Sequence, residues 1–272
     1  MTFEKIIEAI PDKPYYLDET SEIAIYCADC RLVLPYISDK SMDLVLTDPP
    51  YETMLKWEGI GTTARMGMGK KGTSADAPSK FFKVIRNSEL PFFLKEFYRI
   101  LEMKRHCYVM CDDDTLPYIF QCLGKGWHCP EGCLHWYGEE DEPFTKFTNL
   151  KLLIWDKELL GMGYHYRCQY EFIIMLDKGK NRRLKDLTKP DVLRFKRYNG
   201  EVPTEKPMRL FELLIYQSSN ESEIIIDPFL GSGTTLACAK RLGRKGIGIE
   251  IEERYCRIAK DRLAQSSMGL EI

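Results

Sequence analysis

The segment Asp48-Pro49-Pro50-Tyr51 follows a run of apolar residues and contains side chains that could do chemistry on an amino group. Two prolines fix φ and remove two backbone donors, which leaves carbonyl acceptors in a stiff geometry. A carboxylate and a carbonyl that accept the hydrogens of a ring-conjugated amino group favour its pyramidal, nucleophilic form. The Tyr51 ring could stack on a base that is extruded from a helix. Taken alone, the four residues are also compatible with a strand that ends in a Pro-Pro turn.

A second segment, Ile224–Thr235, predicts a buried strand that ends in Asp227, a turn with two glycines, and a helix. Glycines let the backbone approach a ligand closely, and the helix N-terminus favours the ligand's negative end. The segment lacks the third glycine of the dinucleotide fingerprint and is not a Walker loop. About twenty residues later, Gly246–Glu250 predicts the next strand, whose final acid is placed to bind ribose hydroxyls. The alternative is a surface glutamate after a strand.

Charge is distributed unevenly along a chain of 272 residues whose formal net charge is only −2. Lys178–Tyr198 contains nine Lys or Arg and two Asp, and Lys56–Lys83 contains six basic and two acidic residues. Two basic segments in a nearly neutral chain favour a local polyanion site, such as one for DNA. The alternative is a solvated charged loop.

Ten cysteines in a chain of this length favour reduced thiols. The sequence has no long apolar run and no secretory signal at Met1–Ile10, so we expect a cytoplasmic enzyme. A zinc site is conceivable in one cluster, but the usual paired-cysteine spacing is absent and we expect no metal. That cluster comprises Cys122, His128, Cys129, Cys133 and His135.

These segments need an alternation of buried strands and amphipathic helices to position them, and the hydrophobic pattern predicts one. Near-continuous apolar runs are typical of strands buried in a parallel sheet, and alternation with helices predicts a doubly wound α/β fold. The predicted strands are Ile23–Cys27, Asp43–Thr47, His106–Cys111, Leu150–Trp155, Tyr170–Leu176, Glu223–Asp227 and Lys245–Glu250. The predicted helices include Phe92–Leu101, Pro207–Ser218, Thr234–Leu242 and Arg254–Leu263.

Together, the two motifs resemble those of the DNA amino-methyltransferases, which make N6-methyladenine or N4-methylcytosine. Asp48–Tyr51 precedes the glycine loop, and this permuted order resembles the β group of the family. The similarity extends over roughly residues 23–265 and includes Cys27–Cys30, Leu153–Glu171 and Pro203–Pro207. It implies a doubly wound, seven-stranded Rossmann-like sheet whose last two strands form a hairpin, with S-adenosylmethionine as cofactor.

The resemblance also implies a role for individual residues. The catalytic motif is Asp48, Pro49, Pro50 and Tyr51. The cofactor-binding positions are Asp29, Cys30, Lys206, Asp227, Pro228, Phe229, Gly231, Ser232, Gly233, Thr234 and Glu250. The candidate DNA-binding residues are Lys180, Arg182, Arg183, Lys185, Arg194, Lys196 and Arg197.

We therefore expect a single catalytic domain over residues 1–272, in which residues 52–83 form a DNA-facing loop and 178–204 a target-recognition segment. Residues 126–146 resemble an insertion without an assigned role. The leading Asp48 favours adenine, and the alternatives are an N4-cytosine enzyme, an RNA or protein methyltransferase, and a non-catalytic DNA-binding protein. Expected partners are duplex DNA, a second copy of the chain and a cognate restriction enzyme.

Overall fold

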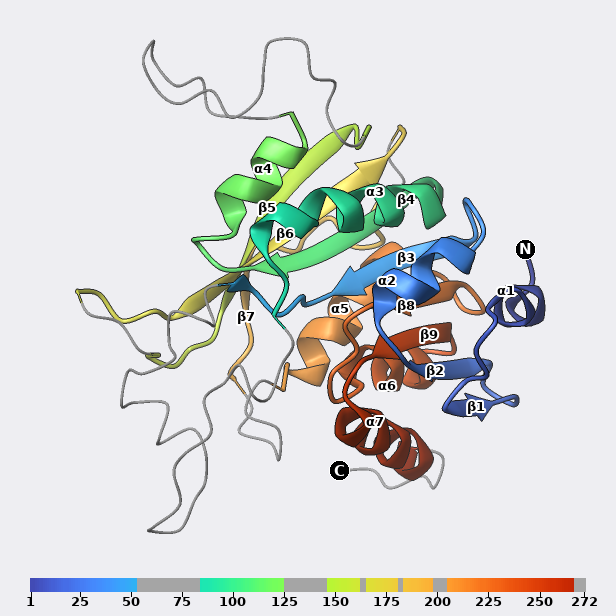
Figure 1. The fold of residues 1–272 in the computed structure, drawn as a ribbon. Coiled ribbons are helices and arrows are strands. Elements are labelled where there is room, and N and C mark those ends of the chain that lie inside the picture. The colour runs from blue at the N-terminus through green and yellow to red at the C-terminus, as the bar shows by residue number, and fades with distance from the viewer. Residues whose placement is uncertain (53–83, 125–145, 162–164, 181–182, 198–204, 267–272) are drawn as a thin grey trace.

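The described part of the chain forms one central sheet between two layers of helices (Figure 1). The computed structural model describes residues 1–52, 84–124, 146–161, 165–180, 183–197 and 205–266. None of the helices within these ranges is long and apolar enough to span a membrane. The loop expected at residues 52–83, apart from Glu52, and most of the insertion at 126–146 lie outside the described residues.

The described residues contribute nine strands to the sheet, in the order β1-β2-β9-β8-β3-β4-β6-β5-β7. β2, β9, β8, β3 and β4 are parallel, so their carboxyl ends share one edge, which we call the carboxyl edge; the opposite one is the amino edge. β6 runs antiparallel to both β4 and β5. The strands are β1 (Tyr16–Asp18), β2 (Ile23–Cys27), β3 (Met42–Thr47), β4 (Leu101–Cys111), β5 (Asn149–Asp156), β6 (Tyr170–Lys178), β7 (Val192–Arg194), β8 (Ile224–Asp227) and β9 (Lys245–Glu250).

Helices cover both faces of the sheet because alternate strand residues point to opposite sides and both sides are apolar. The first four α-helices pack on one face, and the last three pack on the other (Figure 1). The helices are α1 (Phe3–Ala9), α2 (Cys30–Val33), α3 (Leu90–Ile100), α4 (Leu116–Cys122), α5 (Met208–Ser218), α6 (Thr234–Arg241) and α7 (Glu253–Ser266), with short 3-10 turns η1 (Leu34–Tyr36) and η5 (Asn87–Glu89).

The doubly wound fold is confirmed, and so is the antiparallel hairpin of β5 and β6. The expected count of seven strands is wrong, because two three-residue strands extend the sheet at its margins. β1 pairs with β2, and β7 pairs in parallel with β5. Both are too short to show a hydrophobic period, so the sequence pattern could not reveal them.

The connections leave β3 and β8 in opposite directions across the sheet. From β3 the chain continues through α3 to β4 on one side, and from β8 it continues through α6 to β9 on the other. Adjacent parallel strands with this property define a topological switch point, where ligands of open α/β sheets bind beyond the carboxyl ends. Asp48 follows β3 and Asp227 ends β8, so both motifs meet at this point.

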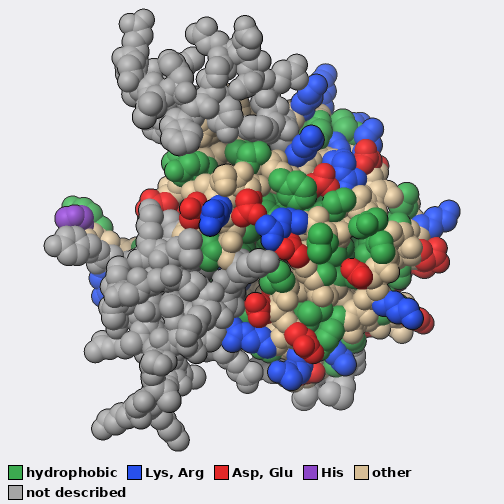
Figure 2. Space-filling model, viewed as in Figure 1, with side chains coloured by type: hydrophobic (Ala, Val, Ile, Leu, Met, Phe, Trp, Pro, Cys, Tyr) green, Lys and Arg blue, Asp and Glu red, His purple; other side chains and the backbone are tan. Residues whose placement is uncertain are grey.

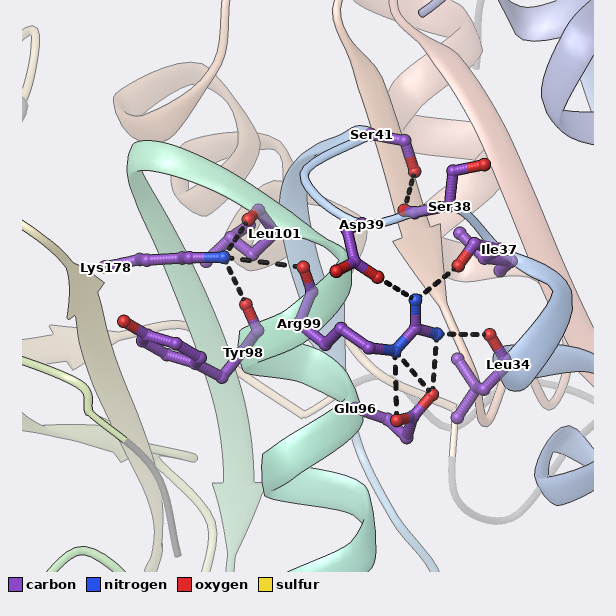
Figure 3. A network of polar contacts seen from close by, with 10 residues as sticks. All are labelled: Leu34, Ile37, Ser38, Asp39, Ser41, Glu96, Tyr98, Arg99, Leu101 and Lys178. Atoms are coloured by element: carbon purple, nitrogen blue, oxygen red, sulfur yellow. Dashed lines mark hydrogen bonds and ion pairs between the residues drawn. The ribbon is translucent and has the colours of Figure 1, made fainter.

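Lys178 begins the basic segment in the sequence, but its side chain is buried at the amino edge (Figure 3). Its Nζ donates to the carbonyl oxygens of Tyr98 at 2.5 Å and Leu101 at 2.6 Å. These groups lie at the end of α3, where the last carbonyls of a helix lack partners within the helix. The neighbouring Arg99 guanidinium bonds the carbonyls of Leu34 and Ile37. Lys178 therefore stabilises the end of α3.

We predict that Lys178→Met lowers the free energy of unfolding by about 1–3 kcal/mol, because buried carbonyl groups lose their donor. Urea denaturation followed by circular dichroism measures this change. Lys180→Met is the matched control, since Lys180 is exposed two residues away and should leave the midpoint unchanged. Equal losses of stability in the two variants would contradict the role given to Lys178.

Candidate active site

Asp227 lies buried at the centre of the carboxyl edge, and both of its carboxylate oxygens accept hydrogen bonds. Oδ1 accepts from Thr47 Oγ1 at 2.8 Å and from the Phe229 amide at 3.1 Å. Oδ2 accepts from Thr235 Oγ1 at 2.5 Å. Burial raises the pKa of Asp227 to about 6, although these donors act in the opposite direction. The carboxylate joins the end of β3 to the loop that follows β8.

The loop between β8 and α6 depends on two glycines with positive φ. Gly231 has φ +55°, and a β-carbon there would meet nothing within 4 Å. Gly233 has φ +84° and precedes α6, and a β-carbon there would lie 2.7 Å from the β-carbon of Ala259 in α7. The first glycine leaves open space and the second permits close packing of α7.

Glu250 at the end of β9 is tied to this glycine loop. Its Oε2 accepts from the Gly231 amide at 2.8 Å and its Oε1 from the Glu252 amide at 2.9 Å. Asp29 follows the neighbouring strand β2, and its Oδ1 accepts from the Arg31 amide at the start of α2. The Asp29 carboxylate also pairs with the Arg31 guanidinium, at 2.5 Å. Acids at the ends of adjacent strands, with open backbone at Gly231, fit the ribose of a nucleoside.

Arg262 of α7 fastens the loop from the other side. Its guanidinium donates to Thr234 Oγ1 at 3.0 Å and to Ser232 Oγ at 3.3 Å, and it forms an ion pair with Glu205. Phe229 packs edge-on against Phe93 of α3, with ring centroids 5.2 Å apart. No sequence pattern indicated a role for Arg262, and Glu205 lay in the family-like segment Pro203–Pro207 without a role of its own.

The segment Asp48–Tyr51 follows directly from β3. Tyr51 is buried, and its hydroxyl donates to Asp48 Oδ1 at 2.6 Å. Burial and the adjacent carboxylate raise the pKa of Tyr51 well above its ordinary value, so it remains a phenol. The Pro50 carbonyl accepts from the Ile85 amide at 2.9 Å, which fixes the chain after the two prolines.

Lys206 contacts the carboxylate of Asp48, a contact that its expected cofactor role did not anticipate. Its Nζ lies 2.6 Å from Asp48 Oδ2 and 3.1 Å from Glu171 Oε2. Glu171 in turn pairs with Lys157, at 2.8 Å. The sequence suggested no role for Glu171 or Lys157 individually, although a charged residue inside the apolar strand β6 is the signal that could have found the first.

The remaining cofactor-binding candidates lie around the same edge. Pro228, Ser232 and Gly233 are buried in the loop after β8. Cys30 is buried at the start of α2, and burial raises the pKa of its thiol far above the ordinary range. Apart from Lys206, the structure thus brings the cofactor-binding candidates together around the ends of β2, β8 and β9.

The DNA-binding candidates, in contrast, are divided between the two edges of the sheet. Lys180 and Lys185 are exposed after the end of β6, and the Lys185 amide bonds the Gln217 carbonyl near the end of α5, at the amino edge. The chain then returns through β7, which pairs Arg194 with Asp156 at the carboxyl edge. Arg183 lies three residues after Lys180 in the sequence, whereas Lys196 and Arg197 come directly after β7. Arg182 lies outside the described residues.

The chain belongs to the DNA methylase family, whose model matches residues 42–261. It is 28% identical over 264 residues to the type II methyltransferase M2.LlaDCHI of Lactococcus lactis subsp. cremoris, covering 92% of each chain. The fold is similar to that of TTHA0409, a putative DNA modification methylase from Thermus thermophilus solved with S-adenosyl-L-methionine. There the TM-score is 0.58 at 23% identity, over 90% of this chain and 95% of that one. The cytosine-N4-specific PvuII DNA methyltransferase gives a TM-score of 0.62 at 17% identity, over 93% and 89%.

We predict different outcomes for alanine at the two loop glycines. Gly231→Ala should cost about 1–2 kcal/mol of stability, because only the positive φ is strained. Gly233→Ala should cost about 1–3 kcal/mol more, because its β-carbon collides with Ala259. Thermal unfolding of both variants checks the order, and equal destabilisation would contradict the packing described for Gly233.

Proposed function

We propose that this chain is a site-specific DNA methyltransferase that transfers a methyl group from S-adenosylmethionine to N6 of adenine in duplex DNA. The observation that most supports this proposal is the Thr47–Asp227 hydrogen bond, which joins the residue before Asp48 to the start of the glycine loop. The residues along the ends of β2, β8 and β9 fit the cofactor, because they offer carboxylates and approachable backbone to a nucleoside. Bound there, the cofactor supplies the methyl group.

In this mechanism the target base is extruded from the duplex into the switch point. Asp48 and the Pro49 carbonyl accept the two amino hydrogens, and the Tyr51 ring stacks on the base after its hydroxyl leaves Asp48. With the cofactor bound along β2, β8 and β9, its methyl carbon would pass to the amino nitrogen as the sulfur–carbon bond breaks, and one amino proton would then leave to solvent. No covalent enzyme intermediate is needed, and positioning supplies most of the acceleration.

Adenine is favoured because the motif begins with Asp48, whereas N4-cytosine enzymes more often begin with serine. Nucleoside mass spectrometry of DNA incubated with enzyme and cofactor tests this choice. Finding N4-methylcytosine and no N6-methyladenine would overturn it. Methylation of tRNA or a peptide with none of duplex DNA would overturn the substrate class.

We predict that Asp48→Ala lowers turnover by about 100-fold or more, because the acceptor of the amino hydrogen is lost. Cofactor affinity, measured by calorimetry, should stay close to that of the wild type. Asp48 follows β3, whereas the proposed cofactor site lies along the ends of β2, β8 and β9. Turnover within a few-fold of the wild-type rate would show that the mechanism is wrong.

We assign DNA contact to the basic residues at the end of β7, Arg194, Lys196 and Arg197, which lie at the carboxyl edge of the sheet. Arg194 is exposed there, and its Nε lies 3.7 Å from Asp156 Oδ2. On the described part of the face in Figure 2, basic and acidic side chains are interspersed rather than gathered by sign. Lys180 and Lys185 lie at the amino edge, far from where a base must enter. Residues 53–83 remain DNA-contact candidates from the sequence alone.

We predict that Arg194→Gln with Lys196→Gln weakens binding of duplex DNA and reduces the salt dependence of log affinity by about one for each phosphate that the variant no longer neutralises. Fluorescence anisotropy at several salt concentrations measures both quantities. The matched control is Lys180→Gln with Arg183→Gln, which removes the same charge at the amino edge and should leave affinity and slope unchanged. A control that weakens binding as much would contradict this assignment.

A further inference from the structure

Four charged side chains from separate segments form a line that ends on the catalytic carboxylate. Asp48 follows β3, Lys206 precedes α5, Glu171 lies in β6 and Lys157 follows β5. The lysine nitrogens alternate with the carboxylates at 2.6, 3.1 and 2.8 Å. Both ammonium groups also lie beside the ring of Trp155, at 5.7 and 5.8 Å from its centroid. The row is neutral overall, and Lys206 lies between its two carboxylates.

Lys206 is held in its charged form. Burial alone would lower its pKa, but Asp48 and Glu171 raise it above the ordinary value. Burial would likewise raise the pKa of Glu171, and Lys206 and Lys157 lower it to about 2 instead. At neutral pH, Lys206 is therefore solely a hydrogen-bond donor, and Glu171 is solely an acceptor.

We propose that Lys206 reads the target base, by donating a hydrogen bond to the ring nitrogen next to the amino group that Asp48 accepts. This inference rests on the proposed function and identifies the residue that selects the base. The Watson–Crick edges of adenine and cytosine present an amino donor beside a ring-nitrogen acceptor. Asp48 and Lys206 present the complement, an acceptor beside a donor, 2.6 Å apart.

The same pair rejects the other two bases. Guanine and thymine present a carbonyl oxygen beside a ring N–H, so carbonyl would face carboxylate and N–H would face ammonium. A site built to hydrogen-bond its substrate discriminates strongly, because a mismatched base leaves buried polar groups unpaired. The ring nitrogen is more nucleophilic than the conjugated amino group, because its lone pair lies in the plane of the ring. A hydrogen bond from Lys206 occupies that lone pair and so disfavours methylation of the ring nitrogen.

Glu171 is a positioning residue in this arrangement. When Asp48 turns to the amino group of the base, the ion pair between Lys206 and that carboxylate weakens. Glu171, already 3.1 Å from Lys206 Nζ, keeps the ammonium compensated. A buried charge without a partner is costly, so the second carboxylate lets Lys206 release the first.

The test replaces the ring nitrogen in the DNA. Two duplexes are compared in single-turnover methylation, one with adenine at the target position and one with 1-deazaadenine, in which C–H replaces N1. The wild-type enzyme should methylate the deaza duplex about 10- to 100-fold more slowly, as expected when a hydrogen bond to a charged group is removed. Weaker pairing of 1-deazaadenine eases its extrusion, so base flipping cannot cause a slower rate.

The Lys206→Met variant should methylate both duplexes at similar, reduced rates. Lys157→Met is the matched control: it removes the other ammonium beside Glu171 and Trp155, and it should retain the preference for adenine. Equal wild-type rates on the two duplexes, or discrimination that survives in Lys206→Met, would overturn base reading by Lys206 while leaving the methyltransferase assignment intact. If the enzyme methylates cytosine, the same rates are compared for cytosine and 3-deazacytosine, and equal rates would overturn base reading by Lys206. Absence of any DNA methylation would overturn both proposals.

Discussion

The buried carboxylate of Asp227 is the interaction on which the site depends. It accepts hydrogen bonds from the end of β3, from its own loop and from the first turn of α6. These donors come from β3 and from the loop and helix that follow β8, so one desolvated group fixes the distance between the glycine loop and the Asp48–Tyr51 motif. Its pKa of about 6 reflects the cost of that burial. Around it, Glu250 and Arg262 hold the loop against β9 and α7, which leaves the loop little freedom to move away from Asp48.

A second constraint is electrical. Beside Asp227, two lysines and two carboxylates alternate in a row that runs from Asp48 to Lys157, and each is stabilised mainly by the opposite charges next to it. Such a row has a defined geometry because every member must face opposite charges once water is excluded. In the proposed mechanism, the donor Lys206 and the acceptor Asp48 are therefore fixed before the base arrives. Selection of the base and activation of its amino group would then follow from this one arrangement.

Much of this could be predicted from the sequence. All seven strands expected from buried apolar runs are present, and the two motifs lie at the switch point as their strand contexts required. The contact between Lys206 and Asp48 could not be predicted, because it joins segments that no local pattern relates. The division of the basic segment between the two edges of the sheet also escaped prediction. Charge composition does not show the path of the chain, and the three-residue strand β7, which brings it back to the carboxyl edge, has only one buried residue. Lys178 shows the same limit: a lysine in a basic run proved to be an internal helix cap.

The order of the motifs has a consequence for how the chain acquires its structure. β3 lies at the centre of the sheet, yet its neighbour β8 is translated long after it, and the hydrogen bond between Thr47 and Asp227 spans 180 residues. Contacts of such long sequence separation form slowly and late. While the chain is being synthesised, one side of β3 has no partner, and its apolar residues require protection from aggregation. The Asp48–Tyr51 motif is thus translated well before the glycine loop that it meets in the folded sheet, and the two cannot come together until β8 has been made.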